Sequence, residues 1–255
     1  MPIKDDLGTR MKTFYEEIPK TKLMRRCPVA IRIDGKAFHT FTRKFEKPFD
    51  EVLIDTMQET MKYLCENIQG CVLGYTQSDE ITLILIDYKK LNSDAWFDYE
   101  VQKMCSIVAS MATMAFNKFF IKVTHKHFEE ELRTLDNKIS DGKFVRLDEI
   151  SNLENKYDKY VNKFYTAMFD ARCFNIPKEE VTNLIYWRQL DASRNQKRGS
   201  CCIKDKNYKP VVCEDGEIHE LISKTLRSYW TVDKEIPIFK GEGRKYIDRL
   251  INVGE

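Results

Sequence analysis

The sequence has little net charge, no paired-cysteine motif and no signal peptide. Lys and Arg total 42 against 40 Asp and Glu, so the formal net charge is +2 and global charge gives no argument for a nucleic-acid partner. The N-terminus, Met-Pro-Ile-Lys-Asp-Asp, does not have a signal-peptide pattern, and no stretch reaches the apolar length expected of a bilayer span. These absences predict a cytoplasmic protein with no membrane partner.

The eight cysteines form no C-x-x-C pair. Cys201, Cys202 and Cys213, together with His219, could build a zinc cluster, but their spacing matches no common zinc site. Reduced, unrelated thiols are therefore the favoured interpretation.

The length of 255 residues and the hydrophobic content of 42% suit one large domain, or a domain with an appendage. Periodicity predicts helices over 5–26, from Asp50 to about 64, over 98–120 and from Pro177 onward. Strands are expected at 28–34, 71–76, 80–87 and 165–175.

This order predicts an α+β fold: the split βαββαβ, ferredoxin-like antiparallel sheet that polymerase palms use. We expect a palm-like catalytic domain over 1–195. The charged stretch at about 126–163 would be an insertion, either exposed helices or mobile chain. The segment 196–255 is then a divergent C-terminal part with a role in RNA contact.

Two acidic residues stand where predicted strands end. Asp34 ends a strand and precedes Gly35, and Asp79 lies between Ser78 and Glu80 in a predicted hairpin. If the strands are neighbours, the two carboxylates meet at one edge of the sheet and could hold a divalent metal and a triphosphate. Turns favour Asp, so for either residue alone a turn role is the better interpretation; the pair together favours metal binding.

Three further residues have both a functional and an ordinary interpretation. His39 follows Asp34 closely and could contact a base or phosphate, although a single histidine is more often a packed or surface residue. Lys47 is by composition an ordinary solvated loop lysine. Lys103 could reach triphosphate oxygens or simply lie on a solvated helix face.

Basic residues gather with aromatic ones over 188–209. Basic density beside Tyr186, Trp187 and Tyr208 suits contact with a phosphate backbone and stacking on bases. A solvated helix end followed by a loop gives a similar composition, so composition leaves the two interpretations even.

Several segments, in this order, resemble the histidine tRNA guanylyltransferase family, and more closely its bacterial and phage-type guanylyltransferase-like branch of 3′–5′ polymerases. The resemblance covers about 30–195 without the charged insertion. The matching segments are 32–39, 46–50, 74–80, 96–97 with 101–103, 169–177 and 187–195. The resemblance implies a nucleotidyltransferase that adds nucleotides to the 5′ end of tRNA.

The resemblance also implies which residues act. Two Mg²⁺ ions would bind Asp34, the backbone carbonyl of Gly35 and Asp79, with Asp34 and Asp79 catalytic and Lys47 tied to 5′ activation. The implied nucleotide-binding residues are Asp34, Gly35, Lys36, Ala37, Phe38, His39, Ser78, Asp79 and Lys103. The candidate RNA contacts are Arg188, Arg194, Asn195, Lys197 and Arg198. Substrates would be tRNA, ATP and GTP or another nucleoside triphosphate, and the family tends to form tetramers.

In that family, ATP first adenylylates a 5′-monophosphate, and the 3′-hydroxyl of an incoming nucleotide then expels AMP. Eukaryotic members carry His-Ile-Asn-Asn where this chain has Ser193-Arg194-Asn195-Gln196. This departure favours template-dependent tRNA 5′-end repair over guanylate addition to histidine tRNA. Glu100 stands where eukaryotic members have arginine, so the resemblance does not imply a phosphate contact at this position.

Two other classes remain as alternatives: a nucleotidyl cyclase-like enzyme on the same sheet, and a non-catalytic RNA-binding module with a decayed palm. The basic aromatic stretch and Lys47 argue weakly against the cyclase. The intact Asp34, Ser78 and Asp79 argue against decay.

Overall fold

The computed structural model describes residues 6–47, 49–193, 199–204 and 230–252. Its centre is a sheet of six strands in the order β4-β1-β3-β2-β5-β6, and every neighbouring pair is antiparallel. The strands are β1 (Val29–Gly35), β2 (Cys71–Gln77), β3 (Glu80–Leu85), β4 (Phe169–Asn175), β5 (Ser200–Lys204) and β6 (Trp230–Asp233). The first four strands have the order of the split βαββαβ sheet, which confirms the predicted α+β palm-like fold.

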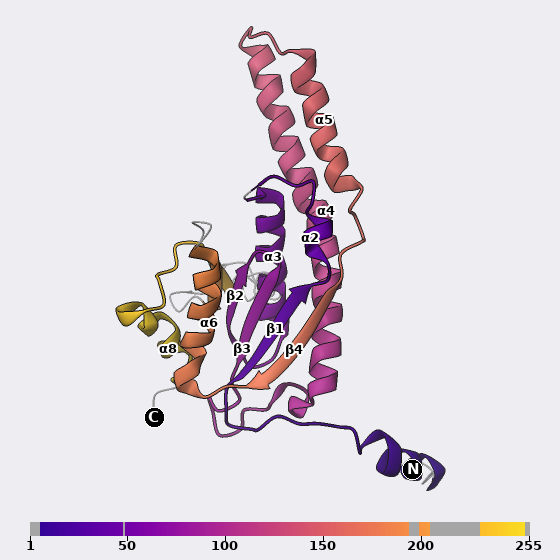
Figure 1. Cartoon of the computed structure of the whole chain (residues 1–255), viewed down its shortest axis with the longest axis vertical. Helices are drawn as coiled ribbons and strands as arrows, with labels where there is room; N and C mark the ends of the chain where they lie inside the picture. The colour runs from indigo at the N-terminus through magenta and orange to yellow at the C-terminus, as the bar shows by residue number, and fades with distance from the viewer. Residues whose placement is uncertain (1–5, 48, 194–198, 205–229, 253–255) are drawn as a thin grey trace, which may run out of the picture.

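Helices cover both faces of the sheet (Figure 1). One face packs on α3 (Glu51–Asn67) and α4 (Val101–Ser140), and the other on α6 (Lys178–Ser193) and α8 (Lys245–Ile251). Alternation along β1 divides its residues between the two cores: Ile31 and Ile33 face α3 and α4, whereas Ala30 faces α6 and α8. The same alternation puts Asp34 on the face of Ala30.

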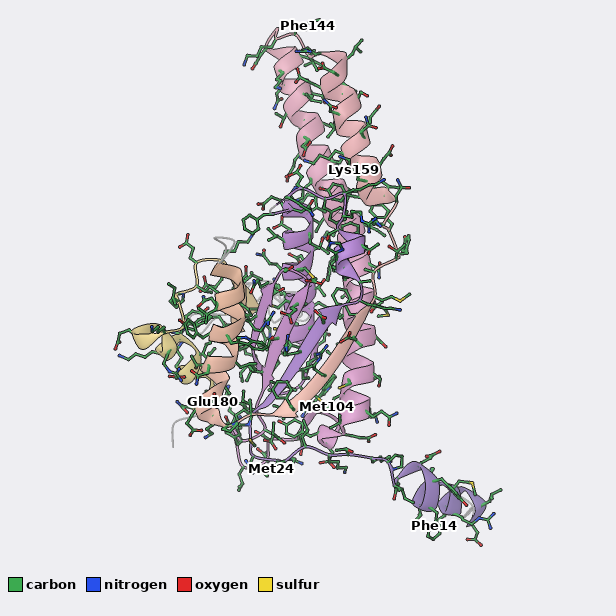
Figure 2. All side chains as sticks on the ribbon, in the orientation of Figure 1. Phe14, Met24, Met104, Phe144, Lys159 and Glu180 are labelled. Carbon is green, nitrogen blue, oxygen red and sulfur yellow. The ribbon has the colours of Figure 1, made fainter. Side chains whose placement is uncertain are left out.

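A helical hairpin extends from the sheet (Figure 1). The helix α4 is 40 residues long, so its predicted end near residue 120 was wrong. It returns as α5 (Leu147–Val161), and Phe144 lies at the tip (Figure 2). Interhelical ion pairs join Lys138 to Glu149 at 3.0 Å and Lys156 to Glu131 at 2.7 Å. The charged stretch 126–163 therefore takes the first of its two predicted forms, exposed helices.

By length and composition alone, α4 is apolar enough to cross a membrane. The sequence prediction that no stretch reaches this length was therefore wrong. Its apolar residues Met104, Val108, Ala112, Phe116 and Phe120 are completely buried in the core that α4 shares with the sheet. A core helix packed in this way passes the same test, so the length of α4 is weak evidence for a membrane span.

Two predicted helix boundaries differ from the structure near the N-terminus. The helix expected over 5–26 is limited to α1 (Asp6–Met11) and the π-helical turn η1 (Lys12–Glu16), because Pro19 has no amide hydrogen and cannot continue a helix. The helix expected to start at Asp98 begins at Val101, because Phe97 and Asp98 have positive φ angles of 50° and 51°. Asp98 instead pairs with Lys22 and Arg25.

The described parts of 196–255 continue the palm sheet through β5 and β6, so the boundary expected at residue 195 falls inside one sheet. Cys201 and Cys202 are neighbours on β5 and belong to opposite cores, so they cannot ligate one ion. Cys213 and His219 lie outside the described residues. The seven cysteines that the structure describes are all free thiols.

Candidate functional site

Asp34 and Asp79 lie together at one end of the sheet. Strand pairing puts Asp34 opposite Glu80, and the Gly35 amide donates a 3.1 Å hydrogen bond to the carbonyl of Asp79. The predicted meeting of the two acidic segments is therefore confirmed. It occurs at the ends of central strands, since β1 lies between β4 and β3.

Local backbone geometry explains the residue types around these acids. Ser78 has a φ of 53°, and its Oγ donates a 3.0 Å hydrogen bond to Oδ1 of Asp79. At Gly35, a Cβ atom would lie 2.3 Å from the Phe38 ring, so a larger residue would displace this ring. The loop after Asp34 therefore depends on glycine for its tight approach.

The predicted nucleotide-binding loop continues from Lys36 to His39. Phe38 is buried and its ring packs 4.8 Å from that of Phe41 and 5.1 Å from that of Phe169, measured between centroids. Phe38 can therefore offer a ligand only its backbone. The side chains of Lys36, Ala37 and His39, which follow Asp34 closely in the chain, are exposed. The Lys36 amide donates a hydrogen bond to the carbonyl of Met168 at 2.8 Å, which fixes the loop.

The surroundings of Asp34 and Asp79 disfavour the ionised forms of both side chains. Burial, and then repulsion from Asp79, Glu80 and Asp170, raises the pKa of Asp34. Burial also raises the pKa of Asp79, although the Ser78 hydroxyl opposes that shift. A bound cation would relieve this repulsion directly.

The site fits Mg²⁺ better than a metal that needs a full set of protein ligands. Across the described ranges of the chain, no three His, Cys, Asp or Glu side chains are grouped so as to hold an ion. Asp34, Asp79 and the carbonyl of Gly35 are oxygen donors, and Mg²⁺ is commonly held by one or two carboxylates with water and phosphate oxygens completing its shell. The donor set therefore suits a cation delivered with a nucleotide.

The raised carboxylate pKa values predict that activity and stability oppose each other at this site. A carboxylic acid whose pKa is higher in the folded than in the unfolded protein stabilises the fold at pH values below its unfolded-state pKa. This stabilisation is lost as the pH rises through the folded-state pKa. At pH 7 without divalent ions, Asp79→Asn is therefore expected to raise the melting temperature, and Mg²⁺ to raise that of wild type more than that of the variant. Thermal unfolding with EDTA or Mg²⁺ measures both effects. A wild type more stable than Asp79→Asn in EDTA would contradict the prediction.

Glu80 has a different role from its acidic neighbours. Its two carboxylate oxygens pair with Arg32 of β1 and Arg188 of α6, and all three side chains are largely buried. The guanidinium carbons of both arginines lie over the Trp187 ring, at 5.3 Å for Arg32 and 4.6 Å for Arg188. We conclude that Glu80 anchors α6 to the β2–β3 hairpin that carries Asp79.

This arrangement revises the expectation for Arg188. The sequence predicted an RNA contact, but the guanidinium is engaged by Glu80 and only 15% of the side chain is exposed. The geometry therefore gives Arg188 a positioning role. Arg194, Asn195, Lys197 and Arg198 lie outside the described residues, so their RNA contacts stay predictions.

Lys47 and Lys103 lie apart from each other. Lys47 is exposed in the loop between α2 (Phe38–Phe41) and α3.

Lys103 is in the first turn of α4, next to Met104, which lies at the end of the sheet where β1 starts (Figure 2). Thr113 lies ten residues further along α4, which corresponds to about 15 Å of helix. Its Oγ1 accepts a hydrogen bond from the Phe169 amide, and Phe169 pairs with Gly35 in the sheet. Within one chain, the structure does not bring Lys103 to the carboxylates.

Two charged residues near Asp34, Asp170 and Arg172, were not predicted from the sequence. Asp170 of β4 lies directly opposite Asp34, and its Oδ1 is 3.2 Å from Nη2 of Arg172. Both side chains are exposed. The alternation of strand 169–175 could have placed Asp170 and Arg172 on one face, but only the β1–β4 register brings them to Asp34.

Comparison with known proteins gives concordant matches. The model of the tRNAHis guanylyltransferase family matches residues 8–177. An uncharacterized protein of Acanthamoeba polyphaga mimivirus is 32% identical over 210 residues, covering 76% of this chain and 61% of that protein. The tRNA(His) guanylyltransferase of Schizosaccharomyces pombe is 29% identical over 162 residues, covering 61% and 57%. The chain thus spans less than two thirds of the length of these relatives.

Two solved structures match over nearly their whole length. A bacterial tRNA(His) guanylyltransferase-like protein in complex with GTP has a TM-score of 0.70 and 34% identity, covering 96% of this chain and 99% of that one. The corresponding ATP complex has a TM-score of 0.69 and 31% identity over the same shares.

Proposed function

The chain belongs to the tRNA(His) guanylyltransferase family, and we propose that it is a Mg²⁺-dependent nucleotidyltransferase that adds nucleotides to the 5′ end of tRNA in the 3′–5′ direction. The observation that carries the proposal is the meeting of Asp34, Gly35 and Asp79 at one end of a palm-like sheet. The GTP and ATP bound by the similar bacterial protein support nucleoside triphosphates as substrates.

The proposed reaction has two transfers. In the first, an oxygen of the RNA 5′-monophosphate attacks the α-phosphorus of ATP and pyrophosphate leaves. In the second, the 3′-hydroxyl of an incoming nucleotide attacks the RNA 5′ phosphorus and AMP leaves. Mg²⁺ would neutralise developing charge and lower the pKa of the attacking hydroxyl.

The chain's own residues hold the reacting groups. Asp34 and Asp79 supply the carboxylates, and Glu80 with Arg32 and Arg188 fixes the hairpin that carries Asp79. Lys36 and His39 are exposed in the segment that follows Asp34, and we assign them to contacts with phosphate oxygens. The loop backbone is fixed by the carbonyl of Met168 through the amide of Lys36, so donor groups need little reorganisation.

We further propose template-dependent repair of truncated tRNA 5′ ends as the biological reaction. The support is the sequence Ser193-Arg194-Asn195-Gln196 in place of the eukaryotic motif. The test is incubation of 5′-truncated, monophosphorylated tRNA with ATP and labelled GTP. Extension at the 5′ end supports the proposal. Formation of a cyclic nucleotide without extension would replace it with the cyclase alternative.

Lys47→Ala is expected to block addition to 5′-monophosphorylated tRNA much more than addition to 5′-triphosphorylated tRNA. The reason is that a 5′-triphosphate already carries a leaving group and needs no adenylylation. Single-turnover rates on the two RNAs measure the difference, for which we expect at least about tenfold. Equal losses on both substrates would remove Lys47 from the activation step. Lys143→Ala at the hairpin tip is the matched control.

Two further expectations remain predictions for this chain. The tetramer, which the family resemblance implies, would be tested by size-exclusion chromatography with light scattering. The cytoplasmic location is the expectation drawn from the sequence composition and the N-terminus.

A further inference from the structure

A groove with a volume of about 550 Å³ lies between the outer surface of α4 and the segment that leads into β4. One side is the outer surface of α4 between Thr113 and Lys122, and the other includes Tyr165, in the segment that leads into β4. This surface has no part in the reaction steps derived above.

The wall of this groove is fixed in place. The Asn117 amide group donates to the carbonyl of Ala167 at 2.9 Å and accepts from the Ala167 amide at 3.3 Å. The Phe169 amide donates to Oγ1 of Thr113 at 3.1 Å. Between these two anchors, the carbonyl of Met168 accepts from Lys36 at 2.8 Å. The groove wall is therefore continuous with the loop that follows Asp34.

Tyr165 is placed in an unusual way. Its φ is +61°, which bulky side chains rarely adopt, and 78% of the residue is exposed. Met114, on the facing helix, is 67% exposed. Backbone strain of this kind clusters at active sites and ligand clamps.

The charge around the groove is positive. Residues 101–128 contain no Asp or Glu. Lys118 and Lys122 line the groove, are exposed, and form no ion pair with any residue that the structure describes. One turn further along, Lys126 pairs with Glu130 at 3.8 Å. The two groove lysines are thus available to phosphate groups.

We propose that this groove binds a single-stranded end of the RNA substrate, with a base stacked on Tyr165 and backbone phosphates near Lys118 and Lys122. The inference rests on the proposed function, since it takes the RNA to be the substrate of the neighbouring site. An aromatic ring beside unpaired lysines is the combination that single-stranded nucleic acid uses. The hydrogen bond between the Lys36 amide and the Met168 carbonyl connects this groove wall to the loop that follows Asp34, where the reacting RNA end would lie.

The test measures binding of a 5′-truncated, monophosphorylated tRNA by fluorescence anisotropy at several salt concentrations. Tyr165→Ala is expected to weaken binding about tenfold, whereas Tyr165→Phe keeps the ring and the affinity. The double variant Lys118→Gln with Lys122→Gln is expected to make the slope of log K against log salt shallower by about 1.4. Lys126→Gln, the matched control outside the groove, is expected to change the RNA affinity and the salt slope much less than the groove variants do.

Two outcomes would overturn the groove assignment while leaving the enzyme in place. One is wild-type RNA affinity in both Tyr165→Ala and the lysine double variant, with extension activity retained. The other is an equal effect of Lys126→Gln, which would indicate a general charge effect. A changed oligomer mass in the groove variants with unchanged RNA affinity would assign the surface to a second copy of the chain. Wild-type protein that neither binds nor extends tRNA would refute the proposed function itself.

Discussion

Asp34→Ala and Asp79→Ala are each expected to reduce nucleotide addition at least about 1,000-fold, because a lost carboxylate removes a metal interaction worth several kcal/mol at the transition state. The measurement is the single-turnover rate of 5′ extension on a truncated tRNA with ATP, GTP and Mg²⁺. Because these two acids repel each other in the folded protein, neither replacement is expected to unfold it.

Asp141→Ala is the control for this pair of variants. Asp141 is exposed beyond the end of α4 and pairs only with Lys143 among the residues described, at 3.6 Å. It removes one carboxylate without touching the site, so its rate is expected to equal that of wild type. Activity persisting in either Asp34→Ala or Asp79→Ala, with a folded protein, would refute the metal assignment.

Glu80→Gln is expected to lower the free energy of unfolding by about 3 kcal/mol, which for a chain of this size lowers the melting temperature by roughly 6–12 °C. The reason is that Arg32 and Arg188, whose side chains are only 18% and 15% exposed, lose their shared counter-charge. The Nε of Arg32 is already buried without a hydrogen-bond partner among the described residues, so little local compensation is available. Thermal and urea unfolding measure the loss.

A second replacement separates this explanation from a general loss of packing. Removing one guanidinium in the double variant Glu80→Gln with Arg188→Met reduces the like-charge repulsion, so part of the stability should return. A melting temperature unchanged in Glu80→Gln would show that the arginines do not depend on Glu80. Further loss in the double variant would instead assign the effect to packing around Trp187.

Much of the fold could be predicted from local sequence. Alternating apolar residues predicted the four palm strands. The helix predicted from Asp50 is α3, and Asp50 is its N-cap, since its Oδ1 accepts a hydrogen bond from the Leu53 amide at 2.9 Å. The length of α4 was underestimated because its charged second half suggested an insertion. In fact no Gly or Pro interrupts the helix before Gly142, so nothing in the chain stops it earlier.

The site was predictable only where its residues are close in sequence to strand ends. Asp34 and Asp79 could be paired from strand order, since β1 and β3 are neighbours in the split βαββαβ sheet. The contact of Glu80 with Arg188 spans 108 residues and depends on how α6 crosses the sheet. Within one chain, Lys103 lies away from the carboxylates, which the sequence could not show because the direction in which α4 runs past β4 was unknown.

The most direct test of the account uses four truncated, 5′-monophosphorylated tRNAs that differ only in the nucleotide opposite the missing 5′ position. Each is incubated with the wild-type protein, Mg²⁺, ATP and all four nucleoside triphosphates, and the added nucleotide is identified. The account predicts that each RNA gains the Watson–Crick complement of its opposing nucleotide, and that Asp79→Ala adds none. Addition of guanylate to all four RNAs would contradict template-dependent repair, and no addition to any of them would contradict the enzyme assignment.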